Sequence, residues 1–255
     1  MTVFIAPDPT RSFFERVVKS VSGTFSMSEE EVRNNFVLSP ETVLIANKLQ
    51  PNKSAYQFSP RNNVGASFPT DNRLDQNDYF AIQSIGLKIG RSTYTSATGA
   101  YSQYGNYPKF SYPEPLYFNG NPAAGLDEWE CLQTIVNGQY SFNVGSQQII
   151  AQDTCQKLFY NPNRPYTSAV LQLPEYNGLG DPASRGLYSL PMNFILDLNQ
   201  DNLFNVILGD GDTTVIDGSQ TSAGAASTWR NHLWVELEGV VIKNMGGNRK
   251  GAMAC

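Results

Sequence analysis

The only histidine of the chain, His232, limits the catalytic sites that it can form. A Ser-His-Asp or Cys-His arrangement would have to use this residue, and a metal site with two histidines and a carboxylate needs one more histidine than the chain has. His232 begins a run of alternating apolar residues, so we expect it at the surface, at the end or edge of a strand. We therefore predict that the protein is not an enzyme.

Two acidic segments have residue types that bind hard cations. Asp197–Asp201, DLNQD, has the spacing of the first three ligands of an EF-hand loop. The match then fails, because Asn202 stands where such a loop needs glycine and Leu208 where it needs glutamate. The second segment, Asp210–Gly218, combines aspartate with glycine and threonine, which turn formation explains. We predict turns in both segments, with no metal and no cofactor.

Tyrosines gather in the stretch Ser92–Pro115, which is rich in Ser, Thr and Gly and has few aliphatic residues. This pattern predicts a long surface loop, and loops of this length usually carry recognition or subunit contacts. The residues that we single out for recognition or subunit contact are Tyr101, Tyr104, Tyr107 and Tyr112.

Residues 9–21, PTRSFFERVVKSV, place apolar side chains on one face of a short helix and charged ones opposite. We expect Pro9-Thr10 at its start and Gly23 at its end; the capping-box spacing of Ser28 and Glu31 predicts a second helix. The first helix can pack on one end of a β-sandwich, or lie as an arm on a membrane or a neighbouring subunit. The residues considered for that membrane or subunit contact are Phe13, Phe14, Val17 and Val18.

Two long strands are predicted to organise the fold. Asn77–Arg91 and His232–Lys243 both alternate apolar with polar residues and both carry a glycine near the middle. The alternation slips at Ser84–Gly86, which predicts a β-bulge. Strands of matched length so far apart in sequence favour non-local antiparallel pairing, as in a jelly roll or Greek-key sandwich.

Shorter segments predict hairpins around these strands. Trp129–Val136 and Gln139–Val144 flank an Asn-Gly pair, the strongest short-range signal for a two-residue turn. Gln147–Ala151 predicts a third strand of the same meander, and Met192–Leu198 with Leu203–Leu208 predicts a second hairpin. About eight strands from Phe80 onward, without a parallel βαβ pattern, predict an all-β jelly-roll sandwich or barrel. We assign residues 1–35 to an N-terminal helical arm and residues 36–255 to the jelly-roll domain.

Composition limits the function classes. Charged residues are 16% of the 255 residues, below the roughly 25% of soluble domains, so the surface is largely neutral and suits packing in an assembly. The net charge of −5 argues against a surface that binds nucleic acid throughout. Cys131 and Cys155 are expected to be small buried residues, since the three cysteines have no metal-ligand spacing. We expect neither a membrane-spanning run nor a secretory signal.

The order of five motifs resembles that of jelly-roll major capsid proteins of small tailless icosahedral phages, particularly those that infect flavobacteria. The motifs are NDYFAIQSIGLKIG, YPEPLYFNG, VNGQYSFNVGSQQII, LPMNFILDLNQDNLFNVIL and HLWVELEGVVIKN, and they cover about Arg73 to Asn244. The resemblance implies a structural protein of the virion, assembled in the host cytoplasm from trimers or pseudo-hexameric capsomers. Many members carry two jelly rolls, but the strand count favours a single elaborated one, with a compact double jelly roll as the alternative.

The partners implied are copies of the chain itself and other virion proteins. The N-terminal arm, or the basic residues Lys243, Arg249 and Lys250, would be the contact to an internal membrane or the genome; the alternative is an ordinary solvated tail. A second function class is a carbohydrate-binding jelly-roll module, lectin-like or adhesin-like, in which the loop tyrosines stack on sugar rings. A glycosidase has less support, because the glutamates stand at no diagnostic spacing.

Overall fold

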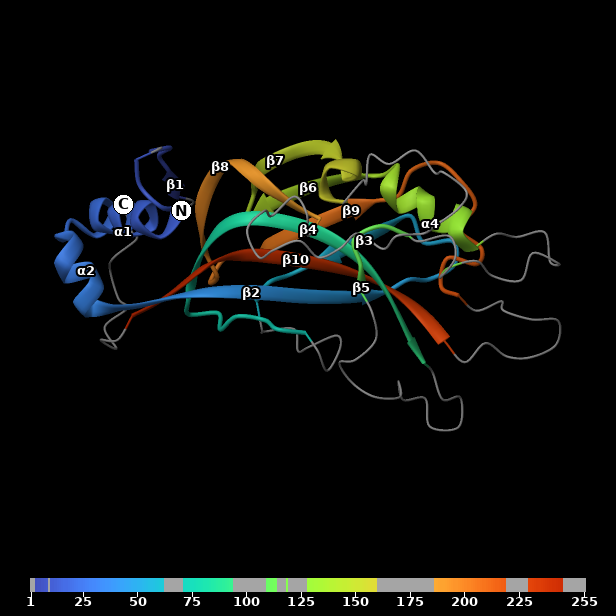
Figure 1. The fold of residues 1–255 in the computed structure, drawn as a ribbon, viewed down its shortest axis with the longest axis horizontal. Helices are drawn as coiled ribbons and strands as arrows, with labels where there is room; N and C mark the ends of the chain where they lie inside the picture. The colour runs from blue at the N-terminus through green and yellow to red at the C-terminus, as the bar shows by residue number, and fades with distance from the viewer. Residues whose placement is uncertain are drawn as a thin grey trace, which may run out of the picture.

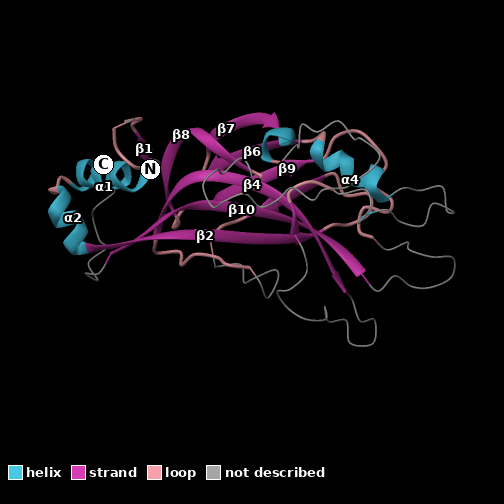
Figure 2. Cartoon of the chain, viewed as in Figure 1, coloured by secondary structure: helices cyan, strands magenta, loops and turns pink. Residues whose placement is uncertain are grey.

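The computed structural model describes residues 3–8, 10–61, 71–93, 109–113, 118, 128–159, 186–218 and 229–244. Within these residues the chain forms two antiparallel β-sheets, which lie over one another with short helices at the two ends (Figure 1). Strand is the dominant secondary structure (Figure 2). The prediction of an all-β class is therefore confirmed as a mainly β-sheet fold.

The larger sheet, sheet A, is built on two long strands that lie side by side. β4 (Tyr79–Thr93) and β10 (Trp229–Asn244) pair antiparallel over almost their whole length, as the alternating patterns predict. The spatial order of sheet A is β1 (Val3–Ile5), β8 (Leu187–Asp197), β4, β10 and β2 (Phe36–Lys48), with β5 (Lys109–Phe110) paired to β4.

The smaller sheet, sheet B, has four strands in the order β3 (Ala55–Phe58), β9 (Asn202–Ile207), β6 (Gln139–Val144) and β7 (Gln147–Thr154). β7 is the predicted third strand of the meander. Side chains from both sheets share one hydrophobic core, for example Ile82 and Leu237 of sheet A with Phe142 and Phe204 of sheet B. The two sheets are thus the two layers of a sandwich.

Apart from β1 and β5, the strands pair in a nested order, in which the first pairs with the last, the second with the last but one, and so on. β2, the first of the eight, pairs with β10, the last; β3 pairs with β9, β4 with β8, and β6 with β7. The chain is therefore a long antiparallel ribbon that is folded over at β6 and β7 and bent into two layers. The predicted hairpin of Met192–Leu198 with Leu203–Leu208 is wrong, because β8 belongs to sheet A and β9 to sheet B. Alternation identifies a strand but does not specify its partner.

A β-bulge lies in β4 at Gln83, one residue before the predicted segment. On β10, Glu238 pairs with Ser84 whereas the next residue, Gly239, pairs with Ile82, so Gln83 has no opposite residue. Gly239 is required there, because a Cβ atom on it would lie 1.9 Å from the carbonyl oxygen of Ala81. The bulge bends the strand and allows apolar side chains on both sides of it to face the core.

Two N-terminal helices pack at one end of the sandwich, on the face of sheet A that points away from sheet B (Figure 1). α1 (Phe13–Phe25) begins after Ser12, which forms a capping box with Glu15, and ends at Ser26 in a left-handed conformation with φ 53°. The helix therefore starts and ends about three residues later than Pro9-Thr10 and Gly23 suggested. α2 (Glu29–Asn35) has the predicted capping box between Ser28 and Glu31 and ends where β2 begins.

Packing of α1 corrects part of the contact prediction. Val17 and Val18 are fully buried, in a cluster with Ala81, Ile195 and Val240 of sheet A. Side chains that are covered by their own sheet cannot also contact a membrane or a neighbouring subunit. The apolar face of α1 thus serves the fold, because it covers residues that would otherwise be an exposed apolar patch on sheet A.

The segment Glu128–Val136 is a helix, α4, so the predicted hairpin across Asn137-Gly138 is wrong. Five of its six buried residues follow a helical period of three and four: Glu128, Cys131, Leu132, Ile135 and Val136; the sixth is Thr134. The Asn-Gly pair instead ends the helix, since both backbone N–H groups donate to carbonyls of its last turn. A short 3₁₀ helix, Cys155–Leu158, follows β7.

Candidate functional site

His232 lies in the interior of the fold, not at a surface edge as predicted. It is 0% exposed and pairs with Gly90 of β4 on one side and Lys48 of β2 on the other. Burial, followed by the charge of Lys48, lowers the pKa of its imidazole to about 3. The side chain therefore stays neutral at neutral pH and is enclosed, so a substrate could not reach it in this conformation.

The two acidic segments form turns, as predicted. Asp197 accepts a hydrogen bond of 2.9 Å from the backbone N–H of Asn199, and Asp212 accepts one of 2.8 Å from Thr214. The carboxylate of Asp201 lies 3.4 Å from the guanidinium of Arg61. Among the described residues, no group of three His, Cys, Asp or Glu side chains could hold a metal ion.

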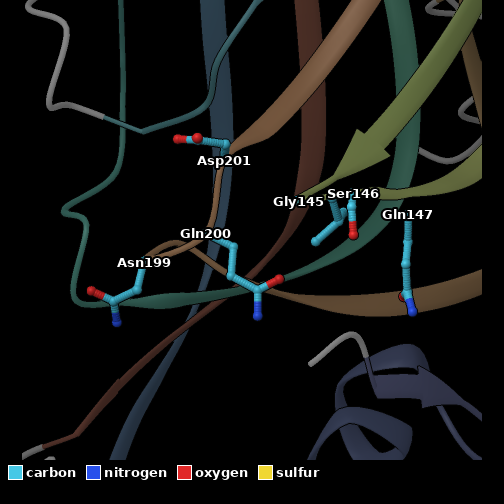
Figure 3. Close-up of a pocket in the computed structure, with 7 residues that line it drawn as sticks. Gly145, Ser146, Gln147, Asn199, Gln200 and Asp201 are labelled. Atoms are coloured by element: carbon cyan, nitrogen blue, oxygen red, sulfur yellow. The ribbon is translucent and has the colours of Figure 1, made fainter.

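A pocket of about 490 Å³ lies where the β6–β7 turn meets the β8–β9 turn (Figure 3). We call it the turn pocket; its lining residues are Val144, Gly145, Ser146, Gln147, Asn199, Gln200 and Asp201. The side-chain amides of Gln147, Asn199 and Gln200 point to the same side (Figure 3). Because the two turns are far apart in the sequence, no local pattern could have identified this site.

A second hollow, of about 310 Å³, lies along the side of the sandwich where β1 and β8 of sheet A approach β7 of sheet B. We call it the side groove; its apolar lining comes from Phe4, Tyr140, Ile149, Ile150, Tyr188, Leu190 and Phe194. Phe4 is 51% exposed, one of three large hydrophobic residues exposed in the described part of the chain. An exposed aromatic ring beside an apolar groove is typical of a protein contact surface.

Glu128 anchors α4 to the sandwich through a buried polar cluster. One of its carboxylate oxygens accepts hydrogen bonds from Arg91 of β4 and from the amide of Asn231 of β10. Asn231 also donates to the carbonyl oxygen of Ile216, 3.1 Å away. Burial raises the pKa of Glu128 although the charge of Arg91 opposes it. The cluster connects four segments of the chain, and we interpret it as structural.

The sequence-predicted contact residues are only partly placed. Tyr101, Tyr104 and Tyr107 lie outside the described residues, as do Arg249 and Lys250. Tyr112 is partly buried and packs against the main core. Phe13 and Phe14 are partly buried on α1, where Arg16 and Arg33 lie over their rings at 5.6 and 5.9 Å. Their role in a subunit contact stays a prediction.

The described cysteines are buried, as predicted for Cys131 and Cys155. Burial raises the pKa of both thiols, that of Cys155 to about 12, so neither is a reactive thiolate at neutral pH. Lys243, the described member of the basic C-terminal residues, lies 3.9 Å from the carboxylate of Asp78.

No helix among the described residues is long and apolar enough to cross a membrane. Comparisons with protein-family models, curated proteins and solved structures find no match to this chain.

Proposed function

We propose that this chain is the major capsid protein of an icosahedral virion, folded as a single jelly roll. The observation that carries the proposal is the nested pairing of β2 with β10, β3 with β9, β4 with β8 and β6 with β7. A ribbon folded in this way into two four-stranded layers has the order of an eight-stranded jelly roll, a fold on which viral capsid proteins are built. Since one fold hosts many functions, the order of the five sequence motifs is the second support.

The number and pairing of the strands favour a single jelly roll over a compact double one. The eight nested strands fill both sheets of the described residues, apart from the short strands β1 and β5. A second roll would need a second set of nested pairs. The N-terminal helices add to the single roll by covering one end of the outer face of sheet A.

One side of the sandwich, where the described residues leave a strand edge unpaired, supports assembly from copies of the chain. Among the described residues β7 forms the edge of sheet B, and its sequence, QQIIAQDT, has no proline and one charged residue, Asp153, which is paired with Lys157 at 2.8 Å. Proteins that remain monomeric usually cover such an edge or place charges on it. The edge of β2, by contrast, is partly covered, because Asn72 pairs with Leu44. The side groove and Phe4 adjoin β7, so a neighbouring copy would cover apolar surface together with this edge strand.

The partners proposed are copies of this chain and other proteins of the virion, and the location proposed is the virion shell, assembled in the host cytoplasm. With Val17 and Val18 buried in the fold, a contact to an internal membrane or to the genome would use other residues, among them the basic ones near the C-terminus.

We expect the purified protein to assemble in a concentration-dependent way. Light scattering over a concentration series should give a mass that rises from 28.2 kDa per chain to trimers or larger capsomers, because a capsid interface buries enough surface to be stable at micromolar concentrations. A mass that stays at one chain at every concentration would contradict the proposal.

Charge on this side of the sandwich should weaken that assembly. Phe4→Asp places a carboxylate beside the side groove, and we expect it to shift assembly to at least about tenfold higher concentration, since burying an unpaired charge is costly. Gln57→Asp adds the same charge at an exposed site on β3, the opposite edge of sheet B, and is the matched control. Thermal unfolding of both variants checks that the fold is retained. If the two variants assemble at the same concentration, the contact between copies does not involve the side groove.

A further inference from the structure

The turn pocket is lined by hydrogen-bonding groups that the fold itself does not use. The hydroxyl of Ser146 and the side-chain amides of Gln147, Asn199 and Gln200 form no hydrogen bond with another described residue. Each amide offers both donors and an acceptor, and the hydroxyl offers one donor and two lone pairs. The pocket therefore presents several donors and acceptors along its lining (Figure 3).

The backbone that carries these groups is held in place from within. The buried amide of Asn202 donates to the carbonyl oxygens of Asp197 and Gln200, at 3.0 and 2.9 Å. The N–H of Gly145 donates to the carbonyl oxygen of Asp201 at 2.7 Å and so joins the two turns. A ligand would not need to order these turns, so its binding would avoid most of the entropic cost of loop ordering.

The charge of the pocket selects the class of ligand. Asp201 is the one charged lining residue, and its carboxylate is paired with Arg61. The guanidinium of Arg61, beside the lining, is already engaged by Asp201 and by the carbonyl oxygen of Asn199, at 3.4 and 3.0 Å. The described lining therefore offers no uncommitted cation for a phosphate, sulfate or carboxylate group, and no aromatic ring for a nucleobase. A neutral, hydroxyl-rich molecule fits best, because its hydroxyl groups can both donate to and accept from amides and a serine hydroxyl.

We propose that the turn pocket binds a neutral saccharide, through hydrogen bonds from Ser146, Gln147, Asn199 and Gln200 to sugar hydroxyls. The volume of about 490 Å³ lies within the roughly 300–1,000 Å³ of small-molecule sites. The residues of this site are different from the loop tyrosines considered from the sequence. The proposal does not depend on the shell function: an assembled and an unassembled chain would both carry the pocket.

The test is binding of the full chain to an array of neutral and anionic oligosaccharides, followed by titration calorimetry with the neutral oligosaccharide that gives the strongest signal. We expect Gln147→Ala and Gln200→Ala each to raise the dissociation constant of that oligosaccharide about fivefold to tenfold, as the loss of one hydrogen bond predicts. Gln57→Ala removes an exposed amide from β3, outside the pocket, and should leave the dissociation constant unchanged.

Three results would overturn the proposal. The first is that the folded wild-type chain binds no neutral glycan, and the second is that it binds anionic glycans only. The third is that Gln147→Ala and Gln200→Ala leave the binding unchanged. Each can occur whether or not the chain assembles, so failure of the saccharide site and failure of the shell function are distinguishable by light scattering on the same samples.

Discussion

Gly239→Ala is expected to lower the free energy of unfolding by at least about 3 kcal/mol. The new Cβ atom would lie 1.9 Å from the carbonyl oxygen of Ala81 and 3.0 Å from the ring of Phe80. β10 is paired on both sides, with β4 and β2, so the backbone cannot move away from the clash without breaking one of the two ladders. Urea unfolding followed by circular dichroism measures the change.

Gly23→Ala is the matched control. Gly23 is exposed within α1, and a Cβ atom there meets nothing within 4 Å. Because alanine favours a helix over glycine by about 1 kcal/mol, this substitution should stabilise the protein. A Gly239→Ala variant as stable as the wild type would mean that the bulge does not hold β4 and β10 as close as described.

Acid is expected to destabilise the fold through His232. The imidazole has a pKa of about 3 in the folded state, against 6.5 for an unburied histidine. The unfolded chain therefore binds a proton in the window between pH 6.5 and 3 that the folded chain does not bind, so stability is complete above pH 6.5 and falls as the pH falls. Between about pH 6.5 and pH 4.5 the loss from this residue should be about 2 kcal/mol.

Comparison with a His232→Gln variant isolates this effect. Glu128 has a raised pKa and contributes with the opposite sign, since its protonated form is favoured in the folded state, but it contributes equally in both proteins. The unfolding free energy of the wild type, relative to that of the variant, should thus fall by about 2 kcal/mol from about pH 6.5 to pH 4.5. NMR of the single imidazole is an independent check. Titration of His232 near pH 6.5 in the folded protein would contradict its burial.

The long strands could be predicted because their alternation is sustained over many residues. Phe80, Ile82, Leu87 and Ile89 all lie in the core, and the pairing of β4 with β10 follows from their matched lengths. The capping box of Ser28 and Glu31 could also be predicted from the sequence, because it depends only on local hydrogen bonds.

Other elements could not be predicted from local patterns. Asn137-Gly138 suits both a hairpin turn and the end of a helix, and the burial period that distinguishes α4 from a strand is set by packing against the sheets. The partner of β9 and the burial of His232 depend on strands that are distant in the sequence. Edge and centre positions of a sheet are properties of the whole fold, so one strand's sequence does not distinguish them.

The candidate sites were missed for the same reason. The turn pocket joins two turns, and the side groove joins β1 and β8 to β7. Asp197–Asp201 was considered as a cation loop, whereas in the fold it forms a turn, and its residues Asn199, Gln200 and Asp201 line the turn pocket. A site whose residues come from segments far apart in the sequence can be identified only once the fold has brought those segments together.

The most direct test of the shell function is electron microscopy of the purified protein at the highest concentration at which it stays soluble. If the chain is a single jelly roll that forms a shell, the images should show closed shells or ordered tiles of repeated capsomers. Each subunit of a capsomer should then have the size of one two-layered sandwich. Separate single chains with no ordered contacts at every concentration would contradict it.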